Sequence, residues 1–331
     1  MRAIAIVGPT ASGKSDLALA LAHRLGGEIV SCDSMQVYRR LDVGTAKPSE
    51  DEREGIPHHL IDLVDPDVPF SAAEYGVLGR EAISGVLSRG AVPIVCGGTG
   101  LYLEALRDAR HQNAPGADEA YRASLLAEAN TEGGAARLHT RLAELDPESA
   151  EQIHVNNLRR VVRALELIHL TGVPKSRLDA ESRRSGHLVE LLVFCLCYRD
   201  RALLADRINR RVDRMMERGL LSEVERLCRD GYLAEGQSAE QAIGYRQLIP
   251  YLDGKISLSE AVESIKSATR RYAKRQMTWF RRTEGVRFVE VDEGGVPRTR
   301  EELAELLLPE ITAFLKNDNR MSSEERKDMT K

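Results

Sequence analysis

The sequence contains no long hydrophobic run. Its 331 residues are 42% hydrophobic, yet no apolar stretch approaches the roughly 18 residues that a membrane-spanning helix needs. The first ten residues, MRAIAIVGPT, also lack the long apolar segment and small-residue cleavage site of a secretory signal. We therefore expect a globular, cytoplasmic protein with no membrane partner.

Cysteine is scarce and irregularly placed. Five cysteines, an odd number, are spread through the chain, which argues against a disulfide framework and fits a reducing compartment. The cysteines and the eight histidines lack the spacing of zinc ligands. Cys195 and Cys197 alternate along an expected strand, and the pair His58 and His59 is more typical of structural residues than of metal ligands.

An excess of positive charge is also missing. The chain has 47 Lys and Arg against 51 Asp and Glu, which gives a formal net charge of −4. As a total, this charge argues against a nucleic-acid partner, although the inference depends on where the charges lie. The length is sufficient for two domains of about 100–200 residues each.

Apolar patterning predicts how the chain is divided. Strands alternate with helices in the first hundred residues, which implies a parallel sheet, whereas residues 118–182 have helical periods only. We predict an α/β core from residues 1–112 and 188–315, an all-helical domain inserted at 113–187, and a disordered charged tail at 316–331. The expected strands are 3–7, 28–32, 56–64, 91–98, 189–198 and 285–292. The expected helices of the core are 15–25, 72–89, 201–230, 259–282 and 300–316.

A phosphate-binding loop follows the first expected strand. Residues 8–15, GPTASGKS, fit the pattern G-x-x-x-x-G-K-[ST] and have a strand before them and a helix after them. Backbone N–H groups and the helix N-terminus favour an anion, Lys14 adds a positive charge, and the Ser15 hydroxyl suits Mg²⁺. The core is therefore expected to be P-loop NTPase-like, with Mg²⁺ as its cofactor. The expected phosphate-binding residues are Gly8, Pro9, Thr10, Ala11, Ser12, Gly13, Lys14 and Ser15.

The acidic residue that a nucleotide hydrolase places after a buried strand is not evident. The strand at 91–98 leads into Gly97-Gly98-Thr99-Gly100, and Asp62 is an imperfect substitute. Asp33, directly after the second strand, is a candidate general base, or alternatively a cap of the next turn. Thr99, between glycines, offers a hydroxyl to a developing charge, or is a turn residue.

Basic residues concentrate in two segments. Residues 262–282 hold seven basic residues against a single acidic one, Glu263, with aromatics between them. This composition suits a nucleic-acid backbone, while a solvated, salt-bridged face is the alternative. The basic residues that we single out here are Lys266, Arg270, Lys274 and Arg275, and in the expected insertion Arg159, Arg160 and Arg163.

Several motifs together resemble the tRNA dimethylallyltransferases, also called tRNA isopentenyltransferases. They occur in the family's order and cover nearly the whole chain except the tail. The matching segments are GPTASGKS (8–15), SCDSMQVYRRLDVGTAKP (31–48), PHHLID (57–62), GGTGLYL (97–103), RRVVRALEL (159–167), RVDRMMERGLLSEV (211–224), AIGYRQL (242–248) and RRYAKRQMTWFRR (270–282). Two departures are the unusually charged segment 106–115 and the lack of a zinc finger, which suits a bacterial-type member.

The resemblance implies a reaction and roles for the residues. A dimethylallyl group would pass from dimethylallyl diphosphate to N6 of the adenosine 3′ to the anticodon of a tRNA. The P-loop, Mg²⁺ and Arg211 would hold the diphosphate, Asp33 would accept the N6 proton, and Thr99 would contact the leaving oxygen. The adenine would be flipped out of its stack.

The resemblance also implies how tRNA is bound. Asp33, Ser34, Met35 and Gln36, with Thr99, match the adenine-recognition stretch. The helical insertion would close on the anticodon arm through Arg122 and the cluster at 159–163, while residues 266–282 would hold stem phosphates. No protein partner is implied.

Two other functions fit part of the sequence. A small-molecule kinase of the shikimate or nucleoside monophosphate type accounts for the P-loop and an insertion, but not for the basic segment 266–282. A non-catalytic RNA-binding P-loop protein leaves Asp33 and Thr99 without a task.

Overall fold

The chain forms two compact units. The structure, a computed structural model, describes residues 1–108, 116–184, 186–234, 237 and 239–328. One unit comprises Met1–Arg107 and Val189–Lys331, and the other comprises Asp108–Leu188. The sequence predicted these boundaries at 112/113 and 187/188. Among the helices of the described residues, none is long and apolar enough to cross a membrane.

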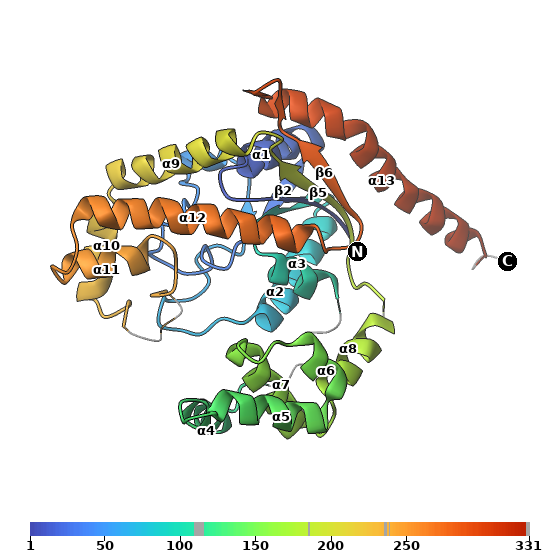
Figure 1. Ribbon diagram of the computed structural model, residues 1–331. Coiled ribbons are helices and arrows are strands. Elements are labelled where there is room, and N and C mark those ends of the chain that lie inside the picture. The colour runs from blue at the N-terminus through green and yellow to red at the C-terminus, as the bar shows by residue number, and fades with distance from the viewer. Residues whose placement is uncertain (109–115, 185, 235–236, 238, 329–331) are drawn as a thin grey trace. The chain divides into compact units, whose positions relative to one another are not determined.

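A six-stranded parallel sheet forms the centre of the larger unit (Figure 1). Every strand pair in it is parallel, as the alternation of strands and helices predicted. In sheet order the strands are β3 (His58–His59), β2 (Gly27–Cys32), β4 (Val92–Gly97), β1 (Arg2–Val7), β5 (Glu190–Cys197) and β6 (Val286–Glu290). The α/β class is confirmed.

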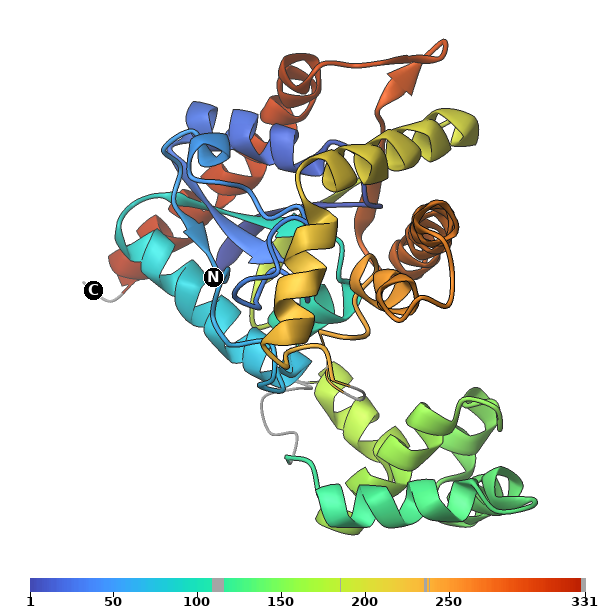
Figure 2. The same cartoon turned by 90° about the vertical axis from the view of Figure 1, so that its left-hand side faces the viewer.

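Helices cover both faces of the sheet because side chains alternate along each strand. Ile4 and Ile6 of β1 pack with α1 (Lys14–Leu25) and α13 (Arg300–Asp328), which lie side by side in Figures 1 and 2. The alternate residues of β1 face the opposite cluster, which includes α2 (Ala72–Ser88) and α3 (Gly100–Arg107).

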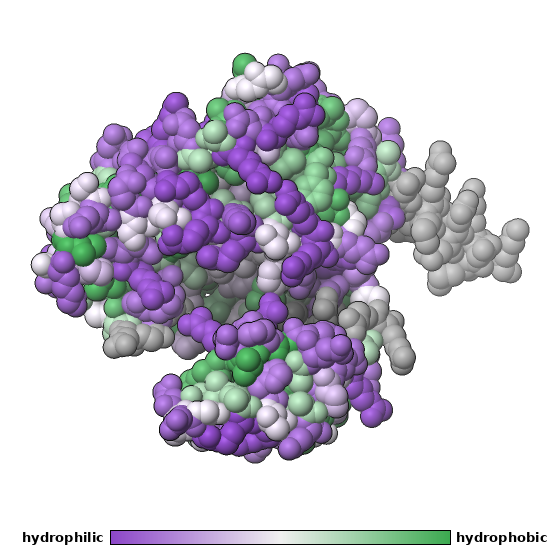
Figure 3. All heavy atoms as spheres, viewed as in Figure 1, coloured by the Kyte–Doolittle hydropathy of each residue, from purple (hydrophilic) through white to green (hydrophobic). Residues whose placement is uncertain are grey.

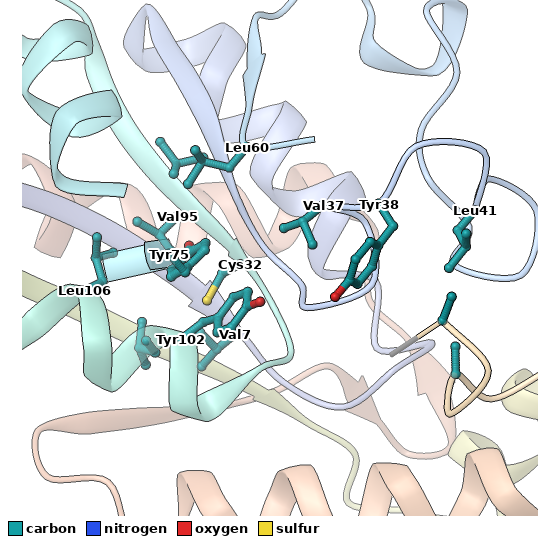
Figure 4. Packing of buried hydrophobic residues seen from close by; sticks show 14 of the residues in the cluster. Val7, Cys32, Val37, Tyr38, Leu41, Leu60, Tyr75, Val95, Tyr102 and Leu106 are labelled. Atoms are coloured by element: carbon teal, nitrogen blue, oxygen red, sulfur yellow. The ribbon is translucent and has the colours of Figure 1, made fainter. Parts of the chain in front are cut away.

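Two stacked tyrosines support the end of β2. The rings of Tyr75 on α2 and Tyr102 on α3 are 4.0 Å apart between centroids. Figure 4 shows Cys32, the last residue of β2, beside both rings. The Tyr75 hydroxyl donates to the Ser31 carbonyl at 2.9 Å. This hydrogen bond from α2 fixes the end of β2, which directly precedes Asp33.

Four further helices complete this unit. The long helix α12 (Leu258–Phe280) packs against α9 (Arg201–Glu217) and α11 (Tyr245–Leu252), and α10 (Leu220–Arg229) packs against α9 and α11. Gly219, with a φ of 94°, separates α9 from α10, so the predicted helical segment 201–230 is two helices.

The smaller unit is all-helical. Its core is an apolar cluster that includes Leu138, Leu142, Val161 and Leu165, all of them buried. The helices are α4 (Glu119–Ala129), α5 (Gly134–Leu145), α6 (Pro147–Gln152), α7 (Leu158–Thr171) and α8 (Lys175–Arg184).

Two predicted elements are wrong in extent. The strand expected at 56–64 is only β3, because Leu60 and Asp62 take positive φ values of 63° and 56° and cannot continue a strand. The helix expected at 300–316 is α13, whose backbone continues to Asp328, and Leu303, Leu307 and Ile311 anchor its first turns against the core. The disorder expected from residue 316 onward stays a prediction. Residues 329–331 lie outside the described residues.

Small elements were also missed. A short hairpin of β7 (Asp292–Glu293) and β8 (Val296–Pro297) follows β6, and a 3₁₀ turn, η1, spans Asp51–Arg53. The Asp292 carboxylate accepts the backbone N–H groups of Arg199 and Asp200 at 2.7 and 3.1 Å, which joins the hairpin to the start of α9.

Glu28 at the start of β2 is expected to stabilise the fold in a pH-dependent way. Hydrogen bonds from Arg89 outweigh burial and, with His59, lower the pKa of Glu28 to about 2. Because this pKa is below the unfolded value, the stabilisation is present above about pH 4.5 and is lost as the pH falls toward 2. Glu28→Gln should lower the free energy of unfolding by about 2 kcal/mol at pH 7, and by less at about pH 3, in urea titrations.

Glu190→Gln is the matched control. Glu190 also pairs with an arginine, Arg2 at 2.7 Å, but its side chain is 57% exposed. Its loss should change the free energy of unfolding by about 0.5 kcal/mol or less. Equal effects of the two substitutions at pH 7 would contradict the role given to Glu28.

Candidate active site

A large cleft lies at the carboxyl ends of the central strands. Its volume is about 1440 Å³, and its lining includes the P-loop from Thr10 to Ser15 and the stretch from Asp33 to Gln36. Arg211 of α9 and Tyr272, Arg275 and Gln276 of α12 line it as well. Since parallel strands direct the loops that follow them to one edge of the sheet, residues far apart in sequence meet here.

The P-loop has the backbone shape of an anion cradle. Gly8 has a φ of 147°, and a Cβ on it would lie 2.8 Å from the Leu196 carbonyl oxygen, so no other residue fits there. Gly13, with a φ of 86°, turns the chain into α1, whose first N–H groups have no partner within the helix. Ser12 is 3% exposed, and its Oγ has no hydrogen-bond partner among the described residues.

Two cations face this cradle. The Lys14 ammonium donates to the Pro9 carbonyl at 3.2 Å, and neither Lys14 nor Arg211 forms an ion pair with a carboxylate of the described residues. Burial lowers the pKa of each, and they also repel one another, while the charge of Asp33 acts in the opposite direction on both. An anion between them would relieve this unfavourable charge.

Arg207, which sequence reasoning missed, contacts the P-loop and lines the same cleft. Its Nε donates to the Ala11 carbonyl at 3.1 Å, and Ala11 holds a positive φ of 63°. Arg207 precedes Arg211 by one helical turn on α9, so one face of this helix serves the P-loop twice. The signal in the sequence is that spacing within a strongly basic helix.

Asp33 and Thr99 occupy adjacent loops but are engaged differently. Oδ1 of Asp33 accepts the Met35 N–H at 2.9 Å, whereas its second oxygen has no partner within the described parts of the chain. One oxygen of Asp33 therefore caps the turn, as one prediction had it, while the other oxygen remains available as the other prediction requires. Thr99 Oγ1 accepts the Ser34 N–H at 3.0 Å and donates to Ser34 Oγ at 3.3 Å, so it holds the loop after β2 and does not line the cleft.

Both polar atoms of the Gln36 amide are hydrogen-bonded to nearby residues. Its Nε2 contacts the carbonyl oxygens of Thr45 and Ala46, both at 3.4 Å, and its Oε1 accepts from Ser31 Oγ at 3.0 Å. Ser34 and Met35 line the cleft with it. The predicted recognition stretch is thus assembled in one place, with Gln36 bracing it.

The basic residues predicted in the segment 262–282, here called the basic stripe of α12, form two groups that differ in their partners and exposure. Lys266 pairs with Asp213 of α9 at 2.7 Å with its side chain only 15% exposed, and Arg270 donates to Asn209 at 2.5 Å. Lys274 and Arg275 are exposed. The face of the molecule over α9 and α12 is largely hydrophilic (Figure 3). Arg275 lies over the Tyr272 ring at 5.5 Å and also lines the cleft.

The predicted arginines of the smaller unit divide in the same way. Arg122 and Arg163 donate to the buried carboxylate of Glu166 at 3.0 and 2.7 Å. Burial would raise the pKa of Glu166, but these hydrogen bonds overcome it and the pKa is lowered. Arg159 and Arg160 are exposed and make no ion pair with the described residues.

The sequence as a whole matches known families. A family model described as IPP transferase matches residues 36–283, and one described as isopentenyl transferase matches residues 1–65. The chain belongs to the IPP transferase family. This membership decides against the kinase alternative and against a non-catalytic RNA-binding protein.

Curated relatives and solved structures agree with this assignment. The chain is 48% identical over 290 residues to a tRNA dimethylallyltransferase of Acetivibrio thermocellus, covering 88% of this chain and 92% of the relative. The corresponding protein of Geobacillus thermodenitrificans is 50% identical over 279 residues, 84% of this chain and 87% of the relative.

The structural neighbours support the fold. A tRNA isopentenylpyrophosphate transferase of Bacillus halodurans has a TM-score of 0.67 at 41% identity, over 96% of this chain and 99% of the other. A eukaryotic dimethylallyltransferase, described as acting on tRNA, has a TM-score of 0.74 at 31% identity, over 87% and 73%. The P-loop NTPase-like fold class is confirmed.

Glu223 joins three of the motifs on which the resemblance rests. Its carboxylate accepts the N–H groups of Asp42, Val43 and Gly44 at 2.9–3.1 Å and the Tyr245 hydroxyl at 2.6 Å. Burial and the adjacent carboxylate raise the pKa of Tyr245, so its hydroxyl stays protonated and donates. A side chain on Gly44 would overlap the Tyr245 ring.

The turn held by Glu223 carries a buried lysine. Lys47 donates to Asp42 at 2.7 Å, to Asp62 at 2.5 Å and to the Tyr38 carbonyl at 2.8 Å. Asp62, the imperfect candidate for a metal-binding carboxylate, is therefore an ion-pair partner. The sequence places Glu223 and Lys47 in motif segments, but only the structure shows that both are buried and which partners each of them has.

Replacing Glu223 should loosen the turn at 42–47. Glu223→Gln places an amide N–H₂ against backbone donors, and we expect a loss of about 2–3 kcal/mol in the free energy of unfolding. Hydrogen exchange should accelerate at the amides of residues 42–44. Tyr245→Phe removes one donor and should cost about 1 kcal/mol without exposing those amides. Unchanged exchange in Glu223→Gln would contradict the assignment.

Proposed function

We propose that this chain transfers a dimethylallyl group from dimethylallyl diphosphate to N6 of the adenosine 3′ to the anticodon in tRNA. Family membership and the names of the relatives support a tRNA dimethylallyltransferase activity. The observation that carries the proposal is one cleft that holds two cations without ion-pair partners beside a half-free carboxylate, Asp33. The cations suit a diphosphate leaving group, and the carboxylate suits an amine acceptor.

The P-loop would bind the diphosphate. The first N–H groups of α1, the Ser12 hydroxyl, Lys14 and Arg211 line one cleft, and they would stabilise the negative charge that grows as the C–O bond breaks. Stabilising the leaving group is the main task here, because an allylic carbon tolerates the positive charge that develops on it.

The residues present fit Mg²⁺ only together with the substrate. No cluster of three or more His, Cys, Asp or Glu side chains that could hold a metal occurs among the described residues. Mg²⁺ commonly uses one or two protein ligands and takes the rest from phosphate oxygens and water. Ser15, exposed at the start of α1, would be the protein ligand, and the ion would add positive charge beside the diphosphate.

Asp33 would serve the acceptor. Its free oxygen would accept a hydrogen bond from the adenine N6 amine and then take its proton as the N6–C bond forms and the C–O bond to diphosphate breaks. Met35 N–H holds the other oxygen at 2.9 Å, which fixes the carboxylate. Thr99 would act through Ser34 by holding this loop, rather than through the leaving oxygen.

The adenine would enter the cleft from a single-stranded loop, where flipping costs least. In each unit, exposed cations without ion pairs would contact RNA phosphates: Lys274 and Arg275 in the larger, Arg159 and Arg160 in the smaller. Lys266, Arg122 and Arg163 would contribute less because they are paired with carboxylates, and Arg270 because its guanidinium already donates to Asn209.

The decisive experiment incubates the protein with undermodified tRNA, Mg²⁺ and dimethylallyl diphosphate, and detects prenylated adenosine by mass spectrometry. Asp33→Asn keeps the acceptor for the Met35 N–H but removes the base. We expect kcat to fall about 10²–10⁴-fold while tRNA affinity changes little. Wild-type rates in Asp33→Asn would remove Asp33 as the base.

Asp16→Asn provides the control, because Asp16 lines the same cleft but is given no role in the reaction. Its kcat should stay near that of the wild type. The absence of prenylated adenosine with wild-type protein, together with phosphorylation of a small molecule by ATP, would overturn the proposal.

The division of the basic stripe gives a second test. Replacing both Lys274 and Arg275 by Ala should weaken tRNA binding and reduce the slope of log Kd against log salt by about 1–2. Lys266→Ala should lower the thermal stability, because it breaks the pair with Asp213, and should leave the salt slope nearly unchanged. The reverse pattern would contradict the assignment.

A further inference from the structure

Gln276 is a buried polar side chain that the reaction described above does not use. It lies on the inner face of α12, is 6% exposed, and shares that face with the apolar residues Ala273 and Phe280. A primary amide among apolar neighbours is unfavourable unless its donor and acceptor are both satisfied.

Both ends of the Gln276 amide are used, each on a different loop. Oε1 accepts the Thr10 N–H of the P-loop at 2.9 Å, and Nε2 donates to the Gly98 carbonyl at 2.9 Å. The two partners fix the orientation of the amide, because a backbone N–H needs an oxygen and a carbonyl needs an N–H.

The contact on the Gly98 side leaves no room for a side chain. A Cβ on Gly98 would overlap Gln276 Nε2 and would lie 3.3 Å from the Gly8 carbonyl oxygen. Gly98 immediately precedes Thr99, which holds the loop of Asp33 through Ser34. Hydrogen bonds therefore link the P-loop through Gln276 to Gly98, and the backbone from Gly98 to Thr99 carries the link to the Ser34 hydrogen bond on the acceptor side of the cleft.

We infer that Gln276 is a positioning residue that sets the separation between the diphosphate cradle and the Asp33 loop. The inference rests on the proposed function for its catalytic consequence, but the link itself is a matter of geometry. The loops after β1 and β4 have no strand pairing beyond Val7 and Gly97, so a side chain must fix their spacing. A shift of about 1 Å between reacting groups can cost about 10²-fold in rate.

Gln276→Glu tests the donor to Gly98 specifically. Ionised glutamate can accept from Thr10 N–H but cannot donate to the Gly98 carbonyl, whereas protonated glutamate can do both. Burial disfavours the charged form, so the substituted carboxyl should become protonated in the accessible pH range. The ratio of variant to wild-type kcat should rise about tenfold between pH 8 and pH 6, with the KM for tRNA unchanged.

Two further variants complete the test. Gln276→Ala should weaken binding of inorganic diphosphate with Mg²⁺, measured by calorimetry, about tenfold and should lower kcat further. Gln237→Glu, outside the cleft, retains its acceptor for the Ala234 N–H and should match the wild type at each pH. Thermal unfolding at both pH values establishes that each variant is folded.

The outcomes separate this inference from the proposed function. A flat pH ratio for Gln276→Glu, or wild-type diphosphate affinity in Gln276→Ala, overturns the positioning role even if prenyl transfer is found. Absence of prenyl transfer in the wild type overturns the proposed function, while weakened diphosphate binding in Gln276→Ala still supports the link between the loops.

Discussion

The site depends on positive charge that the protein itself does not neutralise. Lys14 and Arg211 face one cleft, and the described residues supply no carboxylate in ion-pair contact with either. Burial lowers the pKa of each, and repulsion from Arg211 lowers that of Lys14 further, as repulsion from Arg214 does for Arg211, so the folded chain holds an unfavourable charge arrangement. Lys47, in the turn beside the cleft, is by contrast paired with Asp42 and Asp62. The fold therefore neutralises this structural lysine and leaves Lys14 and Arg211 available to a bound anion.

Buried polar side chains give these loops their shape. Where the strands end, backbone pairing ends as well, and single side chains replace it. Glu223 holds three consecutive N–H groups of the turn at 42–44, and Gln276 joins Thr10 to Gly98. Each comes from a helix distant in sequence, so the loop geometry requires the whole larger unit to be folded. Such contacts are costly to break because a buried donor or acceptor left without a partner has no water to replace it.

The distribution of charge matters more than its total. A net charge of −4 argued against a nucleic-acid partner, yet α12 carries the exposed cations Lys274 and Arg275. The structure also refines the stripe that the sequence predicted. Lys266, Arg270 and Lys274 are four residues apart and share one face of α12. However, α9 covers Lys266 and Arg270 and supplies Asp213 and Asn209 as their partners. A helical wheel cannot anticipate a neighbouring helix.

The sequence by itself determined the α/β class, the P-loop and the family, because these depend on local periodicity and on motifs whose residues are contiguous. It predicted Asp33 as a candidate general base for the same reason, since this residue directly follows a strand. Only the tertiary structure decided that Thr99 braces Ser34, that Gln36 braces residues 45–46, and that Gln276 spans two loops. It also decided that the segment at 56–64 is barely a strand, because positive φ values at Leu60 and Asp62 have no signature in the apolar pattern. The partners of Thr99 and Gln276 lie 65 to 266 residues away, and those of Gln36, 9 and 10 residues away, are brought to it only by the folded turn. A pattern read along one segment contains none of these contacts.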